Sequence, residues 1–225
     1  MTDDIKALES DLRRRIFGDV RFDAYSRGMY STDASIYQIQ PVGVVIPRDL
    51  DDVVGVISSC SDAGVAVLPR GGGTSLAGQT VNHAVVLDFS KYMKRVREVN
   101  PNEAWVRVEP GITLDEMNNQ LRAQGLHFPP DPSTSSRATV GGAIGNNSCG
   151  SHSVVYGKTV DHVKELGVVL SNGSSTSFKL LDKAALDAKL ERKDLEGRIY
   201  NDVISIAAEH RDEIATHYPK IMRRV

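Results

Sequence analysis

The chain has 225 residues, of which 40% are hydrophobic and 25% are charged, so it can bury the core of one large globular domain or two small ones. A formal net charge of −2 excludes the broad basic surface of a nucleic-acid-binding protein. The acidic start Met1–Ile5 lacks the basic and apolar regions of a secretory signal, so we expect none, and no apolar run approaches the roughly 20 residues that span a bilayer. The two cysteines, Cys60 and Cys149, have neither disulfide nor metal-ligand spacing, so we expect a cytoplasmic protein without a metal site.

The first 40 residues are predicted to form a helix and an irregular segment. Apolar residues such as Leu8 and Leu12 recur at helical spacing over residues 3–17, which predicts an amphipathic helix. Residues 17–40 are polar and irregular, and we expect them to wrap over the domain surface without a chemical role.

A regular pattern begins at residue 41. Residues 42–46, 65–68 and 84–88 are short apolar runs that predict strands. A helix between the first two is predicted to begin at the N-cap Asp49 and to end at Gly64. Strand, helix and strand in this order indicate a βαβ unit, so these strands should be parallel.

The middle of the chain favours antiparallel pairing. Residues 95–99 and 104–108 are separated by a turn signal and predict an antiparallel pair. A capping box of Thr113 and Glu116 then predicts the start of a helix that ends at Gly125.

The last third of the chain is predicted to contain a hairpin and helices. Residues 166–180 form the hairpin, with a type I′ turn signal at Asn172-Gly173. Residues 182–225 are predicted to be helical, with a longer helix over residues 200–217. The residues expected on the buried side of that helix are Val203, Ile204, Ile206 and Ala207.

A glycine-rich loop, Pro69-Arg-Gly-Gly-Gly-Thr-Ser-Leu-Ala-Gly78, follows the second predicted strand. Glycine adopts φ > 0 and permits close approach to the backbone, so the loop could turn its N–H groups inward around a phosphate or pyrophosphate. Thr74 and Ser75 add hydroxyl donors. From the loop alone, a flexible surface turn remains the alternative.

Two familiar phosphate motifs fail at this loop. Gly73 and Gly78 have the spacing of a nucleoside-triphosphate-binding loop, but Gln79 stands where the lysine should be. The dinucleotide pattern fails because Leu76 stands where its third glycine belongs.

A second glycine-rich stretch spans residues 128–150. Val140 and Ile144 interrupt it, which indicates an ordered and partly buried backbone rather than a linker. Three glycines here would let that backbone lie against a flat ligand: Gly141, Gly142 and Gly145.

Three side chains in or near this stretch could each have a structural or a functional role. His152 could form structural hydrogen bonds or transfer a proton, and Cys149 could be a small packing residue or a redox group. Tyr156 could contact a cofactor or belong to the core.

Several pieces of the chain, taken together in order, resemble one family. They are Pro69–Gly78, Pro130–Ser133, Thr139–Gly142, Asn147-Ser148, Tyr156-Gly157 and Leu170–Gly173. The chain resembles the FAD-binding domain of the vanillyl-alcohol oxidase and p-cresol methylhydroxylase type. Within it, the chain is most similar to the D-lactate, glycolate and D-2-hydroxyglutarate dehydrogenases, the glycolate oxidase subunit group. The run over residues 146–153 resembles long members that carry an iron–sulfur region.

The resemblance implies an α+β, two-lobed FAD-binding fold. Residues 1–40 would be the N-terminal helix and wrapping segment, and residues 41–180 the FAD-binding domain. That domain would have a small βαβ lobe over about 41–92, and a lobe of antiparallel sheet and helices over about 93–180. Residues 181–225 would be a helical extension.

The same resemblance implies a set of cofactor-binding residues, with FAD extended between the two lobes. Backbone N–H groups from Arg70 to Ser75 would surround the pyrophosphate, and the second stretch would line the flavin and ribityl side. The full set is Pro69, Arg70, Gly71, Gly72, Gly73, Thr74, Ser75, Gly78, Gln79, Pro130, Asp131, Thr139, Gly141, Gly142, Gly145, Asn147, Ser148, Gly150, Tyr156 and Gly157.

Two departures from the family pattern shape the expectation. The first glycine loop lacks the histidine that attaches FAD in some relatives, so non-covalent FAD is expected. The segment that closes over the adenine end and the substrate domain are absent. We therefore expect an N-terminal part of a longer enzyme, inactive alone and without a catalytic residue. The missing domain or a partner subunit would complete the site.

The implied function is oxidation of a D-2-hydroxy acid by hydride transfer to FAD, with an unidentified electron acceptor. The substrate class covers D-lactate, glycolate and 2-hydroxyglutarate. One alternative is a non-catalytic FAD-binding module or subunit, and another is a flavoprotein like the reductase that forms UDP-N-acetylmuramate. A peripheral membrane association of the full-length enzyme is compatible with a cytoplasmic location.

Overall fold

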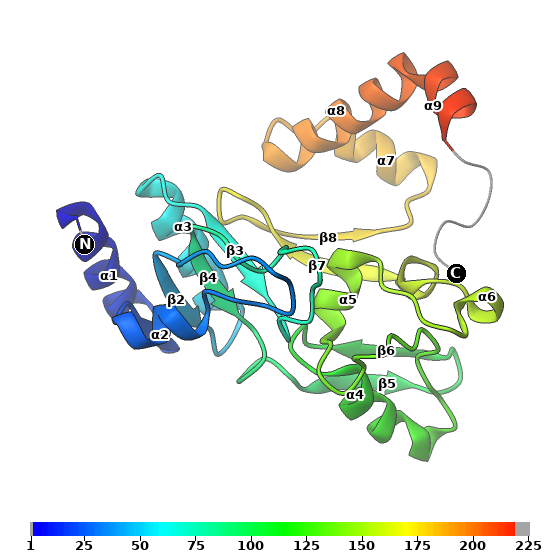
Figure 1. Ribbon diagram of the computed structural model, residues 1–225. Coiled ribbons are helices and arrows are strands. Elements are labelled where there is room, and N and C mark those ends of the chain that lie inside the picture. The colour runs from blue at the N-terminus through cyan, green and yellow to red at the C-terminus, as the bar shows by residue number, and fades with distance from the viewer. Residues whose placement is uncertain (1, 219–225) are drawn as a thin grey trace. The chain divides into compact units, whose positions relative to one another are not determined.

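The computed structural model describes residues 2–218, which divide into two compact units, one ending at His162 and the other beginning at Val163 (Figure 1). The elements of the first unit are α1 (Asp3–Arg15), β1 (Asp19–Arg21), α2 (Ala24–Met29), β2 (Gly43–Ile46), α3 (Leu50–Asp62), β3 (Val67–Arg70), β4 (Val85–Asp88), β5 (Val96–Asn100), β6 (Trp105–Val108), α4 (Leu114–Leu121), η1 (Arg122–Gln124), α5 (Val140–Asn146), α6 (Ser153–Tyr156) and η2 (Thr159–His162). Those of the second unit are β7 (Glu165–Val169), β8 (Ser175–Lys179), α7 (Lys183–Leu190), α8 (Leu195–Glu209) and α9 (Arg211–His217).

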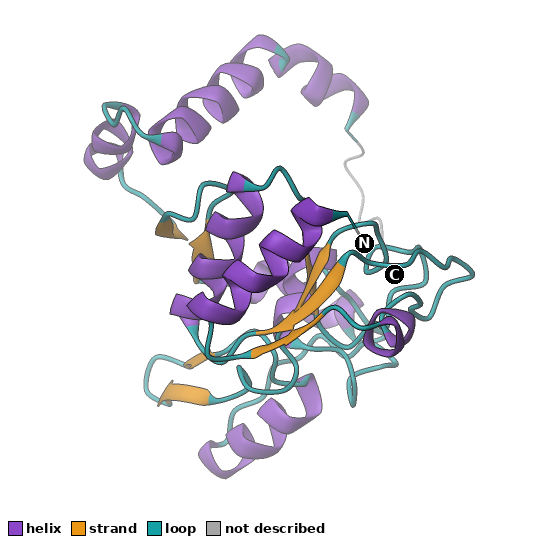
Figure 2. Cartoon of the chain, turned by 90° about the vertical axis from the view of Figure 1, so that its left-hand side faces the viewer, coloured by secondary structure: helices purple, strands orange, loops and turns teal. Residues whose placement is uncertain are grey.

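A four-stranded sheet in the order β1-β2-β4-β3 organises the first half of the first unit. The strands β2, β4 and β3 are parallel, as the βαβ pattern predicts, and β1 joins β2 in antiparallel fashion. Helices α1 and α3 pack against each other, and Figure 2 shows helices over the strands of this sheet. Val44 and Val86 on the two central strands are completely buried, which explains why these strands appear in the sequence as continuous apolar runs.

Helix α3 begins and ends where the sequence predicts. The Asp49 carboxylate accepts a hydrogen bond from the Asp52 N–H at 3.0 Å, so Asp49 is the N-cap. Gly64 follows the C-cap with φ +65°, a left-handed conformation that glycine adopts without a Cβ clash. Strand β3 both starts and ends two residues later than predicted. Pro69 and Arg70 therefore belong to the strand rather than to the loop.

A second sheet and helix form a separate core in the same unit. Strands β5 and β6 pair in antiparallel fashion, and Thr113 and Glu116 form the predicted capping box at the start of α4. The residues of this core are Ile112, Leu114, Met117, Leu121, Ala138 and Ala143. The predicted α+β fold with two lobes is confirmed, because the four-stranded sheet and the β5–β6 sheet each have their own apolar cluster.

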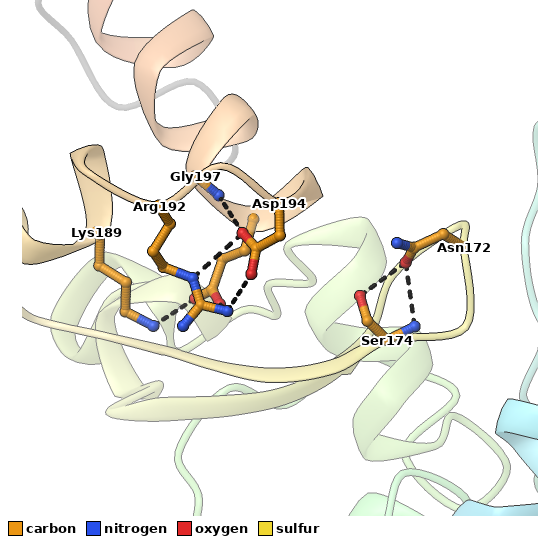
Figure 3. Close-up of polar contacts among 7 residues, drawn as sticks. Asn172, Ser174, Lys189, Arg192, Asp194 and Gly197 are labelled. Carbon is orange, nitrogen blue, oxygen red and sulfur yellow. Dashed lines mark hydrogen bonds and ion pairs between the residues drawn. The ribbon is translucent and has the colours of Figure 1, made fainter.

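The second unit opens with the predicted hairpin, but its turn is not of type I′. A type I′ turn requires φ > 0 at both central residues, whereas only Gly173 adopts it and Asn172 does not. The Gly173 N–H donates to the Leu170 carbonyl at 2.9 Å, so a three-residue connection ends in a left-handed glycine. The Asn172 side chain accepts instead from the N–H and hydroxyl of Ser174, which stabilises this alternative turn (Figure 3).

An ion cluster around the buried Glu196 joins α7 to the start of α8. Glu196 is 5% exposed and pairs with Lys189 and Arg192. Burial opposes its ionisation, but the hydrogen bond from Lys189 prevails, so the pKa of Glu196 lies below its ordinary value. Asp194 caps α8 through the Gly197 N–H at 3.0 Å and also pairs with Arg192 (Figure 3).

The predicted single helix over residues 200–217 is wrong in two respects. Residues 200–217 form parts of two helices, α8 and α9, which are separated at His210. Its expected inner face is exposed, with Val203 at 60%, Ile204 at 40% and Ile206 at 56%, and Ala207 is exposed too. Helical periodicity shows that a face is apolar, but it does not show that anything packs against that face. The last residues of the predicted helical region lie outside the described residues.

Candidate functional site

The first glycine-rich loop leaves the carboxyl end of strand β3 and contains two left-handed glycines. Gly73 has φ +64° and Gly78 has φ +75°. The loop therefore uses the conformational freedom that the sequence predicts for it. Because ligands in open parallel sheets bind beyond the carboxyl ends of the strands, the loop lies at a suitable edge for a site.

The backbone donors of this loop are available. Within residues 2–218, no hydrogen bond takes up the N–H groups of residues 71–75. These residues are at least partly exposed, so their N–H groups can meet a ligand. Successive free N–H groups in a turn are the usual donor set for phosphate oxygens. The loop therefore fits the pyrophosphate of a dinucleotide such as FAD.

The two glycine-rich stretches, far apart in sequence, meet in the first unit. A Cβ added at Gly71 would lie 2.1 Å from the Thr139 hydroxyl oxygen, and one at Gly72 would lie 2.1 Å from the Arg137 carbonyl oxygen. The Gln79 side chain also donates to that of Asn146 at 3.1 Å. Gly71 and Gly72 are therefore required because the first loop packs closely against the second stretch.

The second stretch contains a helix, α5, which its glycine content does not predict because glycine has low helix propensity. The Thr139 side chain caps α5 by accepting from the Gly142 N–H at 3.2 Å. Gly141 packs on Pro110, where an added Cβ would lie 2.8 Å from the proline Cβ. Gly145 is exposed and has open space around its Cβ position, so it is the glycine of this helix that leaves room for a ligand.

The end of the second stretch is bonded to residues 159 and 160 through the Asn147 side chain and the Ser148 carbonyl. Asn147 adopts φ +46°, and its side-chain oxygen accepts from the Val160 N–H at 3.0 Å. The Ser148 carbonyl accepts from both the N–H and the hydroxyl of Thr159 at 3.0 and 2.7 Å. Asn147 and Ser148 therefore join α5 to η2. Tyr156 is half exposed, and its ring lies at right angles to the His127 ring, with 6.2 Å between the two ring centres.

The Asp131 carboxylate binds the turn that follows the second stretch, at Ser151 and His152, and this set of contacts is called the clamp below. Its carboxylate accepts from the His152 N–H at 3.1 Å and pairs with the His152 ring at 2.5 Å. Burial opposes ionisation of Asp131, but the hydrogen bonds from His152 and Ser151 outweigh it, so the pKa of Asp131 lies below its ordinary value. Gly150 is required beside it, because a Cβ there would lie 2.1 Å from the Asp131 carbonyl oxygen.

Residues 17–40, for which the sequence predicts no chemical role, contact the first loop directly. The Ala34 N–H donates to the Gly73 carbonyl at 3.1 Å. The Tyr37 ring covers Gly78, where an added Cβ would lie 2.6 Å from the ring. The available signal was the run of short polar residues over 31–35, which is typical of an ordered turn.

Neither a cluster of metal ligands nor a helix able to span a membrane is found among residues 2–218. Among the residues that the structure describes, no three His, Cys, Asp or Glu side chains gather as metal ligands. None of the helices described between residues 2 and 218 combines the length and apolar character of a transmembrane helix.

Comparison with known proteins identifies the class of domain. The family model of the FAD binding domain matches residues 41–178, so the chain belongs to this family. Its fold is shared with alkyldihydroxyacetonephosphate synthase, with a TM-score of 0.70 and 22% identity over 79% of this chain and 35% of the other. It is also shared with p-cresol methylhydroxylase, with a TM-score of 0.69 and 19% identity over 79% of this chain and 36% of the other. The resemblance that the motifs indicate is confirmed.

The chain is also similar in sequence to enzymes and subunits that are named for 2-hydroxy acids. The D-2-hydroxyglutarate dehydrogenase of Pantoea ananatis is 39% identical over 96% of this chain and 21% of its own length. That of Escherichia coli is 39% identical over 92% of this chain and 20% of its own length. The glycolate oxidase subunit GlcD of Bacillus subtilis is 37% identical over 71% of this chain and 35% of its own. The chain thus spans about a fifth of the length of the dehydrogenases that it matches.

Proposed function

We propose that this chain is the FAD-binding part of a flavin-dependent oxidoreductase that oxidises a D-2-hydroxy acid, with D-2-hydroxyglutarate as the first candidate substrate. The observation that carries the proposal is the meeting of the two glycine-rich stretches beside the N–H groups of residues 71–75, which make no hydrogen bond within residues 2–218. The 39% identity to D-2-hydroxyglutarate dehydrogenases supports the substrate class.

The residues of this chain would bind and orient the cofactor without a covalent bond. Backbone N–H groups of residues 71–75 would hold the pyrophosphate, and the open side of α5 at Gly145 would face the flavin or ribityl part. The chemistry that FAD supplies when bound is acceptance of a hydride from the alcohol carbon. The donors of the first loop are preorganised by the fold, so little ordering is needed on binding.

Gly145→Leu tests where the cofactor lies. The helical backbone at Gly145 accepts leucine, and the new side chain would fill the open space beside α5. We expect the FAD dissociation constant to rise about tenfold or more, because the side chain would clash with the bound cofactor. The matched control is Gly55→Leu in α3, where the Cβ position is also open and no effect is expected. Equal FAD affinity of the two variants in a fluorescence titration would contradict the proposed site.

The enzymatic part of the proposal is tested on the full-length enzyme of which this chain would be the FAD-binding part, because the chain alone is expected to be inactive. D-2-hydroxyglutarate, D-lactate and glycolate are offered with a dye acceptor under anaerobic conditions. We expect the dye to be reduced, fastest with D-2-hydroxyglutarate. No reduction with any of the three would contradict the substrate class while leaving FAD binding in place.

A second candidate is a module that binds FAD without turnover of its own. The first loop and α5 offer backbone donors and glycine surfaces rather than buried acid or base side chains, which favours a binding role. Bleaching of the bound flavin by a 2-hydroxy acid would exclude this candidate, and a flavin that stays oxidised would favour it.

A further inference from the structure

We propose that residues 30–37 form a brace for the first glycine-rich loop, and that Arg70 and Asp33 are the positioning residues that connect the two. The brace lies outside residues 41–178, the part that matches the family model. The inference rests on the proposed function, because the loop is taken to be the phosphate site.

The Arg70 guanidinium is committed to the protein backbone. One of its terminal nitrogens donates to the Thr80 carbonyl at 3.1 Å and to the Tyr30 carbonyl at 3.4 Å. The other donates to the Thr32 carbonyl at 2.8 Å, and the group lies 5.3 Å from the centre of the Tyr30 ring. The planar guanidinium presents donors on separate nitrogens and can reach carbonyls that lie apart, whereas the three donors of an ammonium group all lie on one nitrogen. Arg70 therefore connects the brace to the far end of the loop.

Asp33 makes the complementary connection from the brace. Its carboxylate accepts from the hydroxyl of Thr80 at 3.0 Å and from the N–H of Ser35 at 2.9 Å. Burial opposes its ionisation, but these hydrogen bonds prevail and the pKa of Asp33 is lowered. With the bond from the Ala34 N–H to the Gly73 carbonyl, both Gly73 and Thr80 are tied to the brace.

The brace is itself anchored to the sheet. The Tyr30 hydroxyl donates to the buried Asp88 carboxylate at 2.6 Å, and burial together with this bond raises the pKa of Tyr30. Asp88 is the last residue of β4 and pairs in register with Arg70 at the end of β3. The brace, the loop and the ends of two parallel strands thus form one connected polar network.

This arrangement explains how a loop with free donors keeps its shape. The N–H groups of residues 71–75 make no bond within the described residues that would hold them in place. Order must come from carbonyls and side chains at the margins of the loop, which are the atoms that the brace engages. Loss of the brace should weaken phosphate binding without removing any donor, because ordering the loop would then oppose binding.

The test compares Arg70→Lys and Asp33→Asn with the control Arg48→Lys in the full chain. Arg48 also stacks on a tyrosine, at 5.1 Å from the centre of the Tyr92 ring, but within the described residues its guanidinium makes no hydrogen bond to residues 30–37 or 71–80. Dissociation constants are measured for FAD and for ADP. We expect each brace variant to raise both constants about tenfold, the effect of losing hydrogen bonds to a charged group. The control should bind like the wild type.

Hydrogen exchange of the ligand-free chain gives a second readout. We expect the hydrogen-bonded amides of residues 30–37 and 77–80 to lose protection together in both brace variants, while strands β2 and β4 keep theirs. Wild-type affinity and unchanged exchange in Arg70→Lys and Asp33→Asn would overturn the brace and leave the proposed function intact. Failure of the wild type to bind FAD or ADP would overturn the phosphate site, and the exchange data would still decide the brace.

Discussion

The two glycine-rich stretches are stabilised in opposite ways. The N–H groups of residues 71–75 in the first stretch make no hydrogen bond within residues 2–218, and Arg70 connects this stretch to a segment about 40 residues earlier in the chain. The second uses its own polar groups, with Thr139 as a helix cap and Asp131 as a clamp on His152. The difference shows that glycine content alone does not identify donors available to a ligand. The first stretch offers backbone N–H donors, and the second mainly provides the surface on which the first packs.

Gly72→Val should have the largest effect, because it forces the two stretches apart. A Cβ at Gly72 would lie 2.1 Å from the Arg137 carbonyl oxygen, which is backbone and cannot move aside cheaply. We expect the free energy of unfolding to fall by about 1–3 kcal/mol, the usual cost of overpacking, and FAD binding to be lost. Urea denaturation and flavin titration measure the two effects.

Gly167→Val is the matched control for that change. Gly167 lies in strand β7 with open space around its Cβ position, and valine suits a strand. A Gly72→Val protein as stable as this control would show that the two stretches do not depend on their contact.

Thr139→Val should have an intermediate effect. Thr139 is 1% exposed and caps α5, so valine keeps the shape but removes the acceptor for the Gly142 N–H. Loss of an N-cap costs about 1 kcal/mol, and the conservative change Thr139→Ser should restore most of it. Equal stability of the two variants in thermal unfolding would rule out the cap as a source of stability.

Asp131→Asn should have the smallest effect and a defined pH dependence. The pKa of Asp131 is lowered in the folded state, so its carboxylate stabilises the fold above the ordinary carboxyl pKa. This contribution is lost as the pH falls through the lowered folded-state value. The stability difference between wild type and Asp131→Asn should therefore be present at pH 7 and shrink below about pH 4.

Denaturation at a series of pH values checks this prediction. The control is Asp115→Asn, since Asp115 belongs to the first turn of α4 and lies outside both glycine-rich stretches. A difference between wild type and Asp131→Asn that stays constant down to pH 2 would show that ionisation of Asp131 is not what stabilises the clamp.

Local signals determined much of the architecture. The apolar runs around Val44 and Val86 predicted parallel strands, and Asp49 and Thr113 predicted helix starts, because caps and periodicity depend on residues within one or two turns. The ordered set of glycine motifs was sufficient to place the chain among FAD binding domains.

Tertiary structure decided the rest. Only the fold showed that Gly72 packs on Arg137, that Arg70 reaches the carbonyls of Tyr30 and Thr32, and that the apolar face of α8 is exposed. Each of these depends on which distant atoms meet, and residue spacing along the chain does not carry that information. A glycine pattern therefore indicates where the backbone approaches something closely, and the three-dimensional structure alone tells whether that partner is a ligand or another part of the protein.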